Sequence, residues 1–150
     1  MEERRWITRE VAVSPPGAGM DDFNWRISMA EVTEPGPFSR FEGIDRHLTV
    51  LRGRLRLDFA DRSVTLGPLD SLAFSGSEAV FGTPLEPVLD LNVMTRNGKV
   101  QARMRPVDGK TVLASHTAVL IDLSSLNAML FEDLTGLIGA PPPSLLVEFR

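Results

Sequence analysis

Several arginine side chains lie within segments that otherwise have the pattern of apolar β-strands. Arg26 lies between Trp25 and Ile27, and Arg46 stands at the start of an apolar segment. In a small barrel, alternate residues of each strand point to the interior, where an unpaired charge is very costly. A guanidinium group can hold a carboxylate through two parallel hydrogen bonds. These arginines therefore indicate either a pocket for a carboxylate or a set of internal ion pairs.

The candidate ligand-binding residues are polar, aromatic or thioether side chains on or beside these segments. They are Glu10, Trp25, Arg26, Ser39, Arg40, Phe41, Arg46, Asn92, Met94 and Arg96. In the binding interpretation the arginines hold a carboxylate, the asparagine and serine supply neutral hydrogen bonds, and the aromatic residues form the walls. In the alternative interpretation the cations are already paired inside the protein. The pairs are then Arg46 with Asp45 or Asp90, and Arg26 with Glu31 or Glu10.

Few side chains could hold a metal ion or act as a nucleophile. The chain has no cysteine, and its two histidines, His47 and His116, have no second histidine at ligand spacing. Divalent metals such as zinc take three or four nitrogen, oxygen or sulfur ligands. No Gly-x-Ser-x-Gly motif or glycine-rich phosphate loop occurs either. We therefore expect no metal and no cofactor, and we assign no catalytic residue.

The overall charge and hydropathy of the chain bound its partners and location. The formal net charge of −4 does not favour nucleic-acid binding, which usually needs a basic surface. No stretch approaches the roughly 20 apolar residues of a membrane span. The charged start, Met1–Trp6, lacks the apolar segment of a signal peptide. We expect a cytoplasmic protein without nucleic-acid or membrane partners, and we leave a homodimer open.

Alternating apolar and polar residues predict that these side chains lie on antiparallel strands. The alternation is clearest in residues 23–29, 54–59 and 88–93. Eleven prolines and twelve glycines divide the chain into short segments. This spacing favours strands joined by turns. The sequence therefore predicts an all-β fold with half-buried strands.

One β-rich unit occurs twice in the sequence. Residues 66–74 match residues 123–131 at an offset of 57 positions, and the same offset continues without a gap until Leu146 matches Leu89. Residues 122–138 also have the leucine spacing of an amphipathic helix. The first copy, however, predicts a turn at residues 67–70 followed by a strand. We therefore expect strands near residues 128–131 rather than a helix.

A series of motifs runs in order along the first 96 residues. They are Thr8–Glu10, Trp25–Glu31, Gly36–Arg46, Leu48–Gly53, Phe74–Gly76 and Asp90–Arg96. Together they resemble the HutD/Ves family, although the Trp-x-Asn-Gly-Gly-Gly stretch of the family is absent before Thr8–Glu10. The resemblance implies a bicupin, in which two cupin-like β-barrel lobes of RmlC-like jelly-roll architecture form one compact domain. It also implies a link to bacterial histidine utilisation and a small acidic ligand such as N-formylglutamate, without an assured catalytic activity.

The repeat and the resemblance together predict two unequal lobes. The N-terminal cupin lobe comprises residues 1–100, and a short C-terminal lobe, completed by N-terminal strands, comprises residues 101–150. The second copy of the repeat ends before any segment equivalent to residues 92–96. We therefore expect the binding site in the N-terminal lobe.

Three functions remain open at this point. The first is a metal-free protein that binds a small carboxylate metabolite and has an accessory or regulatory role in histidine utilisation. The second is a metal-independent isomerase or hydrolase, and the third is a non-catalytic interaction scaffold. A pocket with an arginine and no nearby acid or base favours the first function. A carboxyl group such as that of Glu10 or Asp90 facing the arginine favours the second, and a filled barrel favours the third.

Overall fold

The computed structural model describes residues 6–113, 117–133 and 136–150, and these residues form only strands and turns. The strands are β1 (Trp6–Ser14), β2 (Trp25–Val32), β3 (Gly36–Pro37), β4 (Ile44–Arg52), β5 (Leu55–Asp58), β6 (Ser63–Leu66), β7 (Ser71–Ser75), β8 (Phe81–Pro84), β9 (Val88–Arg96), β10 (Ala102–Leu113), β11 (Thr117–Asp122), β12 (Ala128–Glu132) and β13 (Gly136–Phe149). The all-β prediction is confirmed. No helix that could cross a membrane occurs in the part of the chain that the structure describes.

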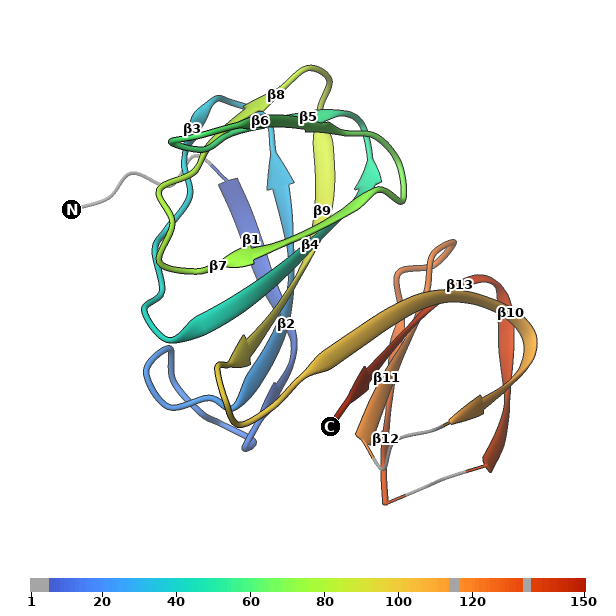
Figure 1. Cartoon of the computed structure of the whole chain (residues 1–150). Helices are drawn as coiled ribbons and strands as arrows, with labels where there is room; N and C mark the ends of the chain where they lie inside the picture. The colour runs from blue at the N-terminus through green and yellow to red at the C-terminus, as the bar shows by residue number, and fades with distance from the viewer. Residues whose placement is uncertain (1–5, 114–116, 134–135) are drawn as a thin grey trace. The chain divides into compact units, whose positions relative to one another are not determined.

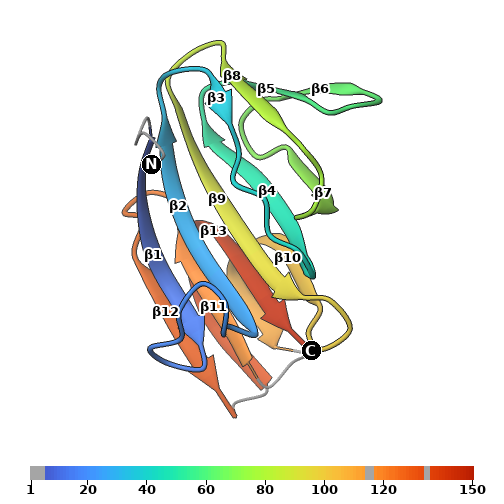
Figure 2. The same cartoon turned by 90° about the vertical axis from the view of Figure 1, so that its left-hand side faces the viewer.

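The chain divides into two compact units, Met1–Asn97 and Gly98–Arg150. The first unit contains a five-stranded sheet in the order β1-β2-β9-β4-β7 and a smaller sheet in the order β3-β8-β5-β6. Figure 1 shows the smaller sheet covering one end of the larger one, and Figure 2 shows the long strands β1, β2, β9 and β4 side by side. All strand pairs within these sheets are antiparallel.

The central strands of the larger sheet are more deeply buried than the sequence predicts. Alternation in β2 and β9 predicts one buried and one solvated face, but nearly every residue of both strands is buried. Ser28, Asp90 and Asn92 are buried although they lie on the polar faces. Central strands of a sheet have neighbours along both edges, and here residues on both faces of β2 and β9 are buried. The polar face of these two strands points to the inside of the first unit.

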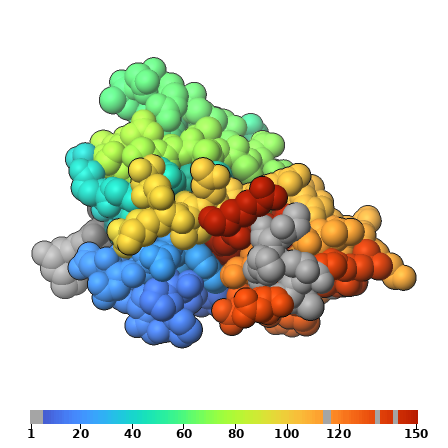
Figure 3. All heavy atoms as spheres, turned by 60° about the horizontal axis from the view of Figure 1, so that its bottom comes forward, coloured from blue at the N-terminus to red at the C-terminus, as the bar shows by residue number. Residues whose placement is uncertain are grey.

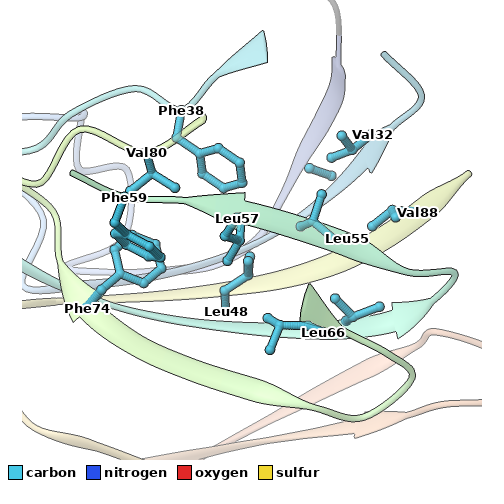
Figure 4. Close-up of a cluster of buried hydrophobic side chains, with 12 residues drawn as sticks. Val32, Phe38, Leu48, Leu55, Leu57, Phe59, Leu66, Phe74, Val80 and Val88 are labelled. Atoms are coloured by element: carbon cyan, nitrogen blue, oxygen red, sulfur yellow. The ribbon is translucent and has the colours of Figure 1, made fainter. Parts of the chain in front are cut away.

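An apolar cluster between the two sheets forms the core of the first unit (Figure 4). The larger sheet contributes Leu48 and Phe74, and the smaller sheet contributes Leu55 and Leu57. The rings of Phe59 and Phe74 meet edge to face, with their centroids 5.4 Å apart. Burying each such side chain contributes roughly 1.5–3 kcal/mol to the stability of the fold. The cluster therefore fixes the smaller sheet over one part of the larger one.

The β5–β6 hairpin shows the predicted alternation clearly. Leu55 and Leu57 are fully buried, whereas Arg54 and Arg56 are exposed. In Figure 3 the hairpin, coloured green, forms the outer edge of the first unit. Alternation therefore predicts the orientation of these side chains correctly, because one face of the hairpin meets the core and the other meets water.

The second unit is a single four-stranded sheet in the order β10-β13-β11-β12. Its buried side chains include Leu113, Ala118, Leu120 and Leu146. The pairing of β13 with β11 and β10 matches the pairing of β9 with β4 and β2 in the first unit. The second unit thus repeats four strands of the larger sheet, and its β11 and β12 are joined by a short turn in place of the β5–β6 hairpin.

The predicted repeat is confirmed over the turn and the strand that follows it. The strand β7 begins at Ser71 and β12 begins at Ala128, at the same offset as the sequence match. The preceding turns share an uncommon backbone conformation, because Leu69 and Leu126 have positive φ angles of 68° and 65°. The strand near residues 128–131 is present, and the helix that the leucine spacing alone favours is not.

The gapless match of the last strand is wrong by three residues. Leu48 pairs with Asn92, and its counterpart Leu120 pairs with Leu146. Leu146 therefore corresponds to Asn92 rather than to Leu89. The second unit does reach the segment equivalent to residues 92–96, contrary to the prediction. The sequence match fails there because leucine and valine satisfy any buried strand position, so identity alone does not fix the register.

Gly76 positions the loop before β4 against the end of β7. Its N–H donates to the Ile44 carbonyl at 2.7 Å, and its carbonyl accepts from the Phe41 N–H at 2.7 Å. A Cβ atom at this position would lie 2.5 Å from the Phe41 oxygen and 2.8 Å from the Ile44 oxygen. The backbone of one loop can therefore approach β7 only at a glycine.

We expect Gly76→Ala to lower the free energy of unfolding by about 1–3 kcal/mol, because overpacking against backbone atoms has effects of that size. Gly139→Ala is the matched control, since no atom lies within 4 Å of the added methyl group. The control should change stability by less than about 0.5 kcal/mol in the same denaturant titration. Equal losses in the two variants would contradict the close approach at Gly76.

Candidate functional site

The inner face of the larger sheet changes from apolar to polar along β2, β9 and β4, which lie side by side in Figure 2. Cross-strand pairing arranges this face in three rows. Starting beside the apolar cluster, the rows are Ala30–Asp90–Val50, Ser28–Asn92–Leu48 and Arg26–Met94–Arg46. Side chains of alternate residues share a face. Antiparallel pairing thus brings two arginines, an aspartate and an asparagine from three strands to one side of the sheet.

These polar residues line a cavity of about 540 Å³ in the first unit. The residues that line it are Trp6, Thr8, Met20, Arg26, Ser28, Ala30, Gly36, Pro37, Phe38, Ser39, Phe41, Arg46, Asp90, Asn92 and Met94. The volume lies within the range of pockets for small molecules. The barrel of the first unit therefore contains a cavity. A filled barrel is the feature that would favour a non-catalytic interaction scaffold, and the first unit does not have it.

Arg46 is a buried cation with neutral hydrogen-bond partners. Its side chain is among the buried polar groups, and Nη1 donates to the Ser39 carbonyl at 3.1 Å and Nη2 to Asn92 Oδ1 at 2.7 Å. Its Nε has no hydrogen-bond partner among the described residues. Burial lowers the pKa of Arg46 to about 10, an effect that nearby Asp90 opposes and Arg26 reinforces. Arg46 therefore remains charged at neutral pH, and its Nε–H is unpaired within the described residues.

Aromatic rings surround the Arg46 guanidinium. The rings of Phe38, Phe41 and Phe74 have centroids 5.4–5.5 Å from the guanidinium carbon. Such contacts stabilise a cation by roughly 0.5–2 kcal/mol each, depending on its exposure. Phe38 is itself held by an edge-to-face contact with Trp6, at 4.9 Å between centroids. The rings thus fix the guanidinium without neutralising its charge.

Asp90 is the second buried ionisable group of the cavity. Its side chain is 1% exposed, and its Oδ1 accepts from Asn92 Nδ2 at 2.9 Å. Its Oδ2 has no hydrogen-bond partner in the described part of the chain. Burial raises the pKa of Asp90 to about 7, although Arg46 and the hydrogen bonds from Asn92 and the Ala30 backbone oppose the rise. The carboxyl group therefore holds its proton to a much higher pH than an ordinary aspartate does.

Arg26 is held by an ion pair at the same side of the sheet. Its Nε lies 3.2 Å from Glu10 Oε1, and the two side chains are 13% and 45% exposed. Of the internal pairs that the sequence suggests, this is the one that the structure contains as a direct contact. Arg46, by contrast, forms no salt bridge with Asp45 or Asp90, because Asn92 stands between it and Asp90.

Six of the sequence-predicted residues line the cavity, and they come from β2, β4, β9 and the loop before β4. They are Arg26, Ser39, Phe41, Arg46, Asn92 and Met94. Ser39 contributes through its backbone carbonyl to Arg46. Glu10 is not among the lining residues and acts on the cavity through Arg26.

The other three predicted residues are not in the cavity lining. Trp25 is buried on the opposite face of β2, because side chains alternate and Arg26 faces the cavity. Arg40 points outward and donates to the Ser77 carbonyl at 2.8 Å. Arg96 donates to the Phe23 carbonyl at 2.7 and 2.9 Å and fixes the loop before β2. Arg40 and Arg96 are thus bound to backbone carbonyls elsewhere in the first unit.

The predicted binding residues leave out several residues of the cavity, of which two matter most. They are Asp90, which the sequence suggests only as an ion-pair partner or an acid facing the arginine, and Phe38. The spacing of Asp90, Asn92 and Met94 carried a usable signal, since alternate residues of one strand share a face. Phe38 lies in a two-proline loop whose direction no periodicity predicts. Its position depends on the Phe38 N–H donating to the Val80 carbonyl at 2.9 Å, a contact between distant segments.

The described residues contain no group of three or more His, Cys, Asp or Glu side chains that could hold a metal ion. His47 lies between Arg46 and Leu48 and therefore on the other face of β4, and burial lowers its pKa. His116 lies outside the described residues. The chemistry that the described cavity offers is therefore that of arginine, aspartate and amide groups.

A sequence profile described as HutD matches residues 1–130. The chain belongs to the HutD family. It is 36% identical over 124 residues to protein Ves of Escherichia fergusonii, covering 79% of this chain and 64% of that protein. It is 37% identical over 109 residues to an uncharacterised 21.2 kDa protein in the hutC 3′ region of Pseudomonas putida, covering 70% and 57%. The chain thus spans less than two thirds of the length of these two relatives.

Solved structures agree with the predicted cupin fold. A conserved protein of unknown function from Pseudomonas aeruginosa PAO1 matches with a TM-score of 0.83 and 28% identity, over 97% of this chain and 90% of that chain. HutD from Pseudomonas fluorescens SBW25 matches with a TM-score of 0.80 and 24% identity, over 95% and 87%. A Cupin_2 domain of an XRE family regulator from Enterobacter cloacae matches with a TM-score of 0.51 and 14% identity, over 61% and 97%. The predicted cupin-type fold is confirmed.

The raised pKa of Asp90 makes stability depend on pH in a defined direction. The pKa in the folded protein is about 7, above the ordinary value of 3.8, so folding favours the protonated acid. Stability from this group is therefore complete below pH 3.8 and is lost as pH rises through 7. We expect Asp90→Asn to avoid that loss and to exceed the wild type by on the order of 4 kcal/mol at pH 8.

Urea titrations at pH 4, 6 and 8 measure this difference in the free energy of unfolding. The free energy of unfolding of Asp90→Asn should be close to that of the wild type at pH 4 and should exceed it by a growing amount as pH rises. Asp61→Asn is the control, because the Asp61 side chain is 76% exposed. An Asp90→Asn variant that follows the wild type at every pH would show that Asp90 is not a buried acid.

Proposed function

We propose that the first unit binds a small carboxylate metabolite, similar to N-formylglutamate, in its cavity without a metal ion. The cavity combines a buried guanidinium, a second arginine at the same level of the sheet and a neutral amide from Asn92. We further propose an accessory or regulatory role in histidine utilisation. Membership of the HutD family and the hutC-region name of the Pseudomonas putida relative support that role.

The observation that carries the binding proposal is the unused Nε donor of Arg46. Arg46 is 5% exposed and donates to a carbonyl and an amide oxygen, so its positive charge has no direct anionic partner. A buried charge without a counter-ion is unfavourable by several kcal/mol. A ligand carboxylate placed at Nε would supply both the missing acceptor and the missing charge. The aromatic rings around Arg46 would then form the apolar wall for the rest of a small acid.

A second candidate is a metal-independent isomerase or hydrolase, and Asp90 is the observation that favours it. The carboxyl group lines the same cavity as Arg46, and its pKa of about 7 suits an acid or base at neutral pH. Exchange of a carbon-bound hydrogen of the acid in deuterium oxide, or its hydrolysis, would support this candidate. Asn92, however, separates the two groups, and no second acid or base lines the cavity in the described residues. Binding alone therefore accounts for more of the site.

Thermal unfolding in the presence of N-formylglutamate, glutamate and urocanate tests the binding proposal. An acid at about a hundred times its dissociation constant should raise the free energy of unfolding by roughly 2.7 kcal/mol. We expect at least one of the three acids to raise the melting temperature of the wild type. We expect Arg46→Gln to weaken binding by about tenfold to a hundredfold, since a hydrogen bond to a charged group contributes about 1.5–3 kcal/mol.

Arg62→Gln is the matched control, because the same change is made at an exposed arginine that pairs with Asp61 and Glu78. This variant should keep the full shift in melting temperature. If none of the three acids shifts the wild type, the carboxylate proposal is wrong. An equal shift in both variants would remove Arg46 from the binding site.

A further inference from the structure

Two buried polar atoms of the cavity residues lack partners in the described structure. They are Nε of Arg46, which is a donor, and Oδ2 of Asp90, which is an acceptor when the acid is ionised. Asn92 holds the two side chains at a fixed separation, since its Oδ1 accepts from Arg46 at 2.7 Å and its Nδ2 donates to Asp90 at 2.9 Å. Unpartnered buried polar atoms are rare in proteins, so a pair at one cavity points to a ligand that meets both.

An anion bound at Arg46 would be close to the Asp90 carboxyl group. Two ionised carboxylates in a site of low dielectric repel each other strongly, and one of them then takes up a proton. A protonated Asp90 instead has an O–H that can donate to a ligand oxygen. The same atom that would repel the ligand as an anion would therefore bind it as a neutral acid.

Among the described residues that line the cavity, no other titratable group can take this proton. The charged groups that face Asp90 are Arg46 on β4 and Arg26 on β2, and Arg26 is paired with Glu10 on β1. The cross-strand neighbours of Asp90 are Ala30 and Val50, which do not ionise. Arginine keeps its proton throughout the physiological range. Of the described lining residues, Asp90 is therefore the one that can take up a proton when an anion binds in this cavity.

We propose that Asp90 contacts the ligand carboxylate as a neutral acid, so that each bound ligand brings one proton from solvent onto Asp90. This inference rests on the proposed carboxylate binding. No bond other than the O–H bond at Oδ2 is formed, and none is broken within the ligand. The two cavity atoms that lack partners are then both donors to the ligand, Nε–H of Arg46 and Oδ2–H of Asp90. Such a site selects a carboxylate over the corresponding amide, because an amide offers an N–H where the site needs an acceptor.

The ionisation of Asp90 in the empty cavity agrees with this mechanism. Burial already raises the pKa of Asp90 to about 7, and a ligand anion beside it raises the pKa further. Affinity should therefore be constant below about pH 6.5 and should fall above pH 7, by about tenfold per pH unit above pH 8. The affinity stops falling once the pH exceeds the pKa that Asp90 has in the complex with the ligand.

Isothermal titration calorimetry with N-formylglutamate and with glutarate tests the inference. The carboxyl groups of both acids are ionised above pH 6, so a proton taken up on binding must be bound by the protein. At each pH, titrations in two buffers that are effective at that pH and differ in ionisation enthalpy count the protons. We expect nearly no uptake at pH 5.5 and most of one proton at pH 8. Affinity for either acid should fall about fivefold between pH 7 and pH 8, and about tenfold between pH 8 and pH 9.

Asp90→Asn should bind both acids with the same affinity at pH 6 and pH 8 and should take up no proton. Its amide can accept from Asn92 and the Ala30 backbone and donate an N–H to the ligand, as the neutral acid does. Asp45→Asn is the control, because Asp45 lies on the other face of β4 and contacts Asn97. This control should keep the proton uptake of the wild type.

Binding without proton uptake at pH 8, or uptake that persists in Asp90→Asn, overturns the inference and leaves the carboxylate proposal intact. If neither acid binds at pH 6, the carboxylate proposal fails for both acids, and the inference fails with it. The wild-type titrations decide between these outcomes even if a variant does not fold.

Discussion

A guanidinium group buried in a β-barrel is the interaction on which the site depends. Water no longer solvates Arg46, and its partners are a carbonyl, an amide and three aromatic rings. None of these carries a full negative charge, and the nearest acid, Asp90, is reached through Asn92. The arrangement keeps the cation in place and leaves its Nε without a partner. The proposed ligand anion would supply the negative charge that these partners lack.

The rest of the first unit holds these groups at a fixed spacing. Antiparallel pairing of β2, β9 and β4 places the two arginines in one row and Asn92 in the next. The apolar cluster between the sheets closes one side, and the Trp6–Phe38 contact supports the aromatic wall. The second unit repeats four strands, but Ala118 stands where Arg46 stands and Leu146 where Asn92 stands. The sheet of the second unit therefore has the same strand pairing but lacks the hydrogen-bonded pair of Arg46 and Asn92.

Alternation and family motifs predict much of this structure, and the failures have specific physical causes. Two-residue periodicity predicts the strands and places the Arg26 side chain on the inner face of the sheet. The same periodicity places Trp25 on the opposite face, although Trp25 is among the predicted binding residues. The long side chains of Arg40 and Arg96 turn to backbone carbonyls of distant loops, which no local pattern encodes. The protonation of Asp90 depends on burial from several strands at once. The last strand of the repeat was misaligned because any apolar residue fits a buried position.

The most direct measurement of the central claim is a nitrogen-15 NMR spectrum of the arginine Nε–H groups during titration with N-formylglutamate. The account predicts that the Arg46 Nε–H resonance moves as the acid saturates the protein, because that group gains its missing acceptor. The resonance of Arg62, an exposed and paired arginine, should not move. An Arg46 resonance that stays unchanged at saturation would show that the buried guanidinium does not hold the ligand.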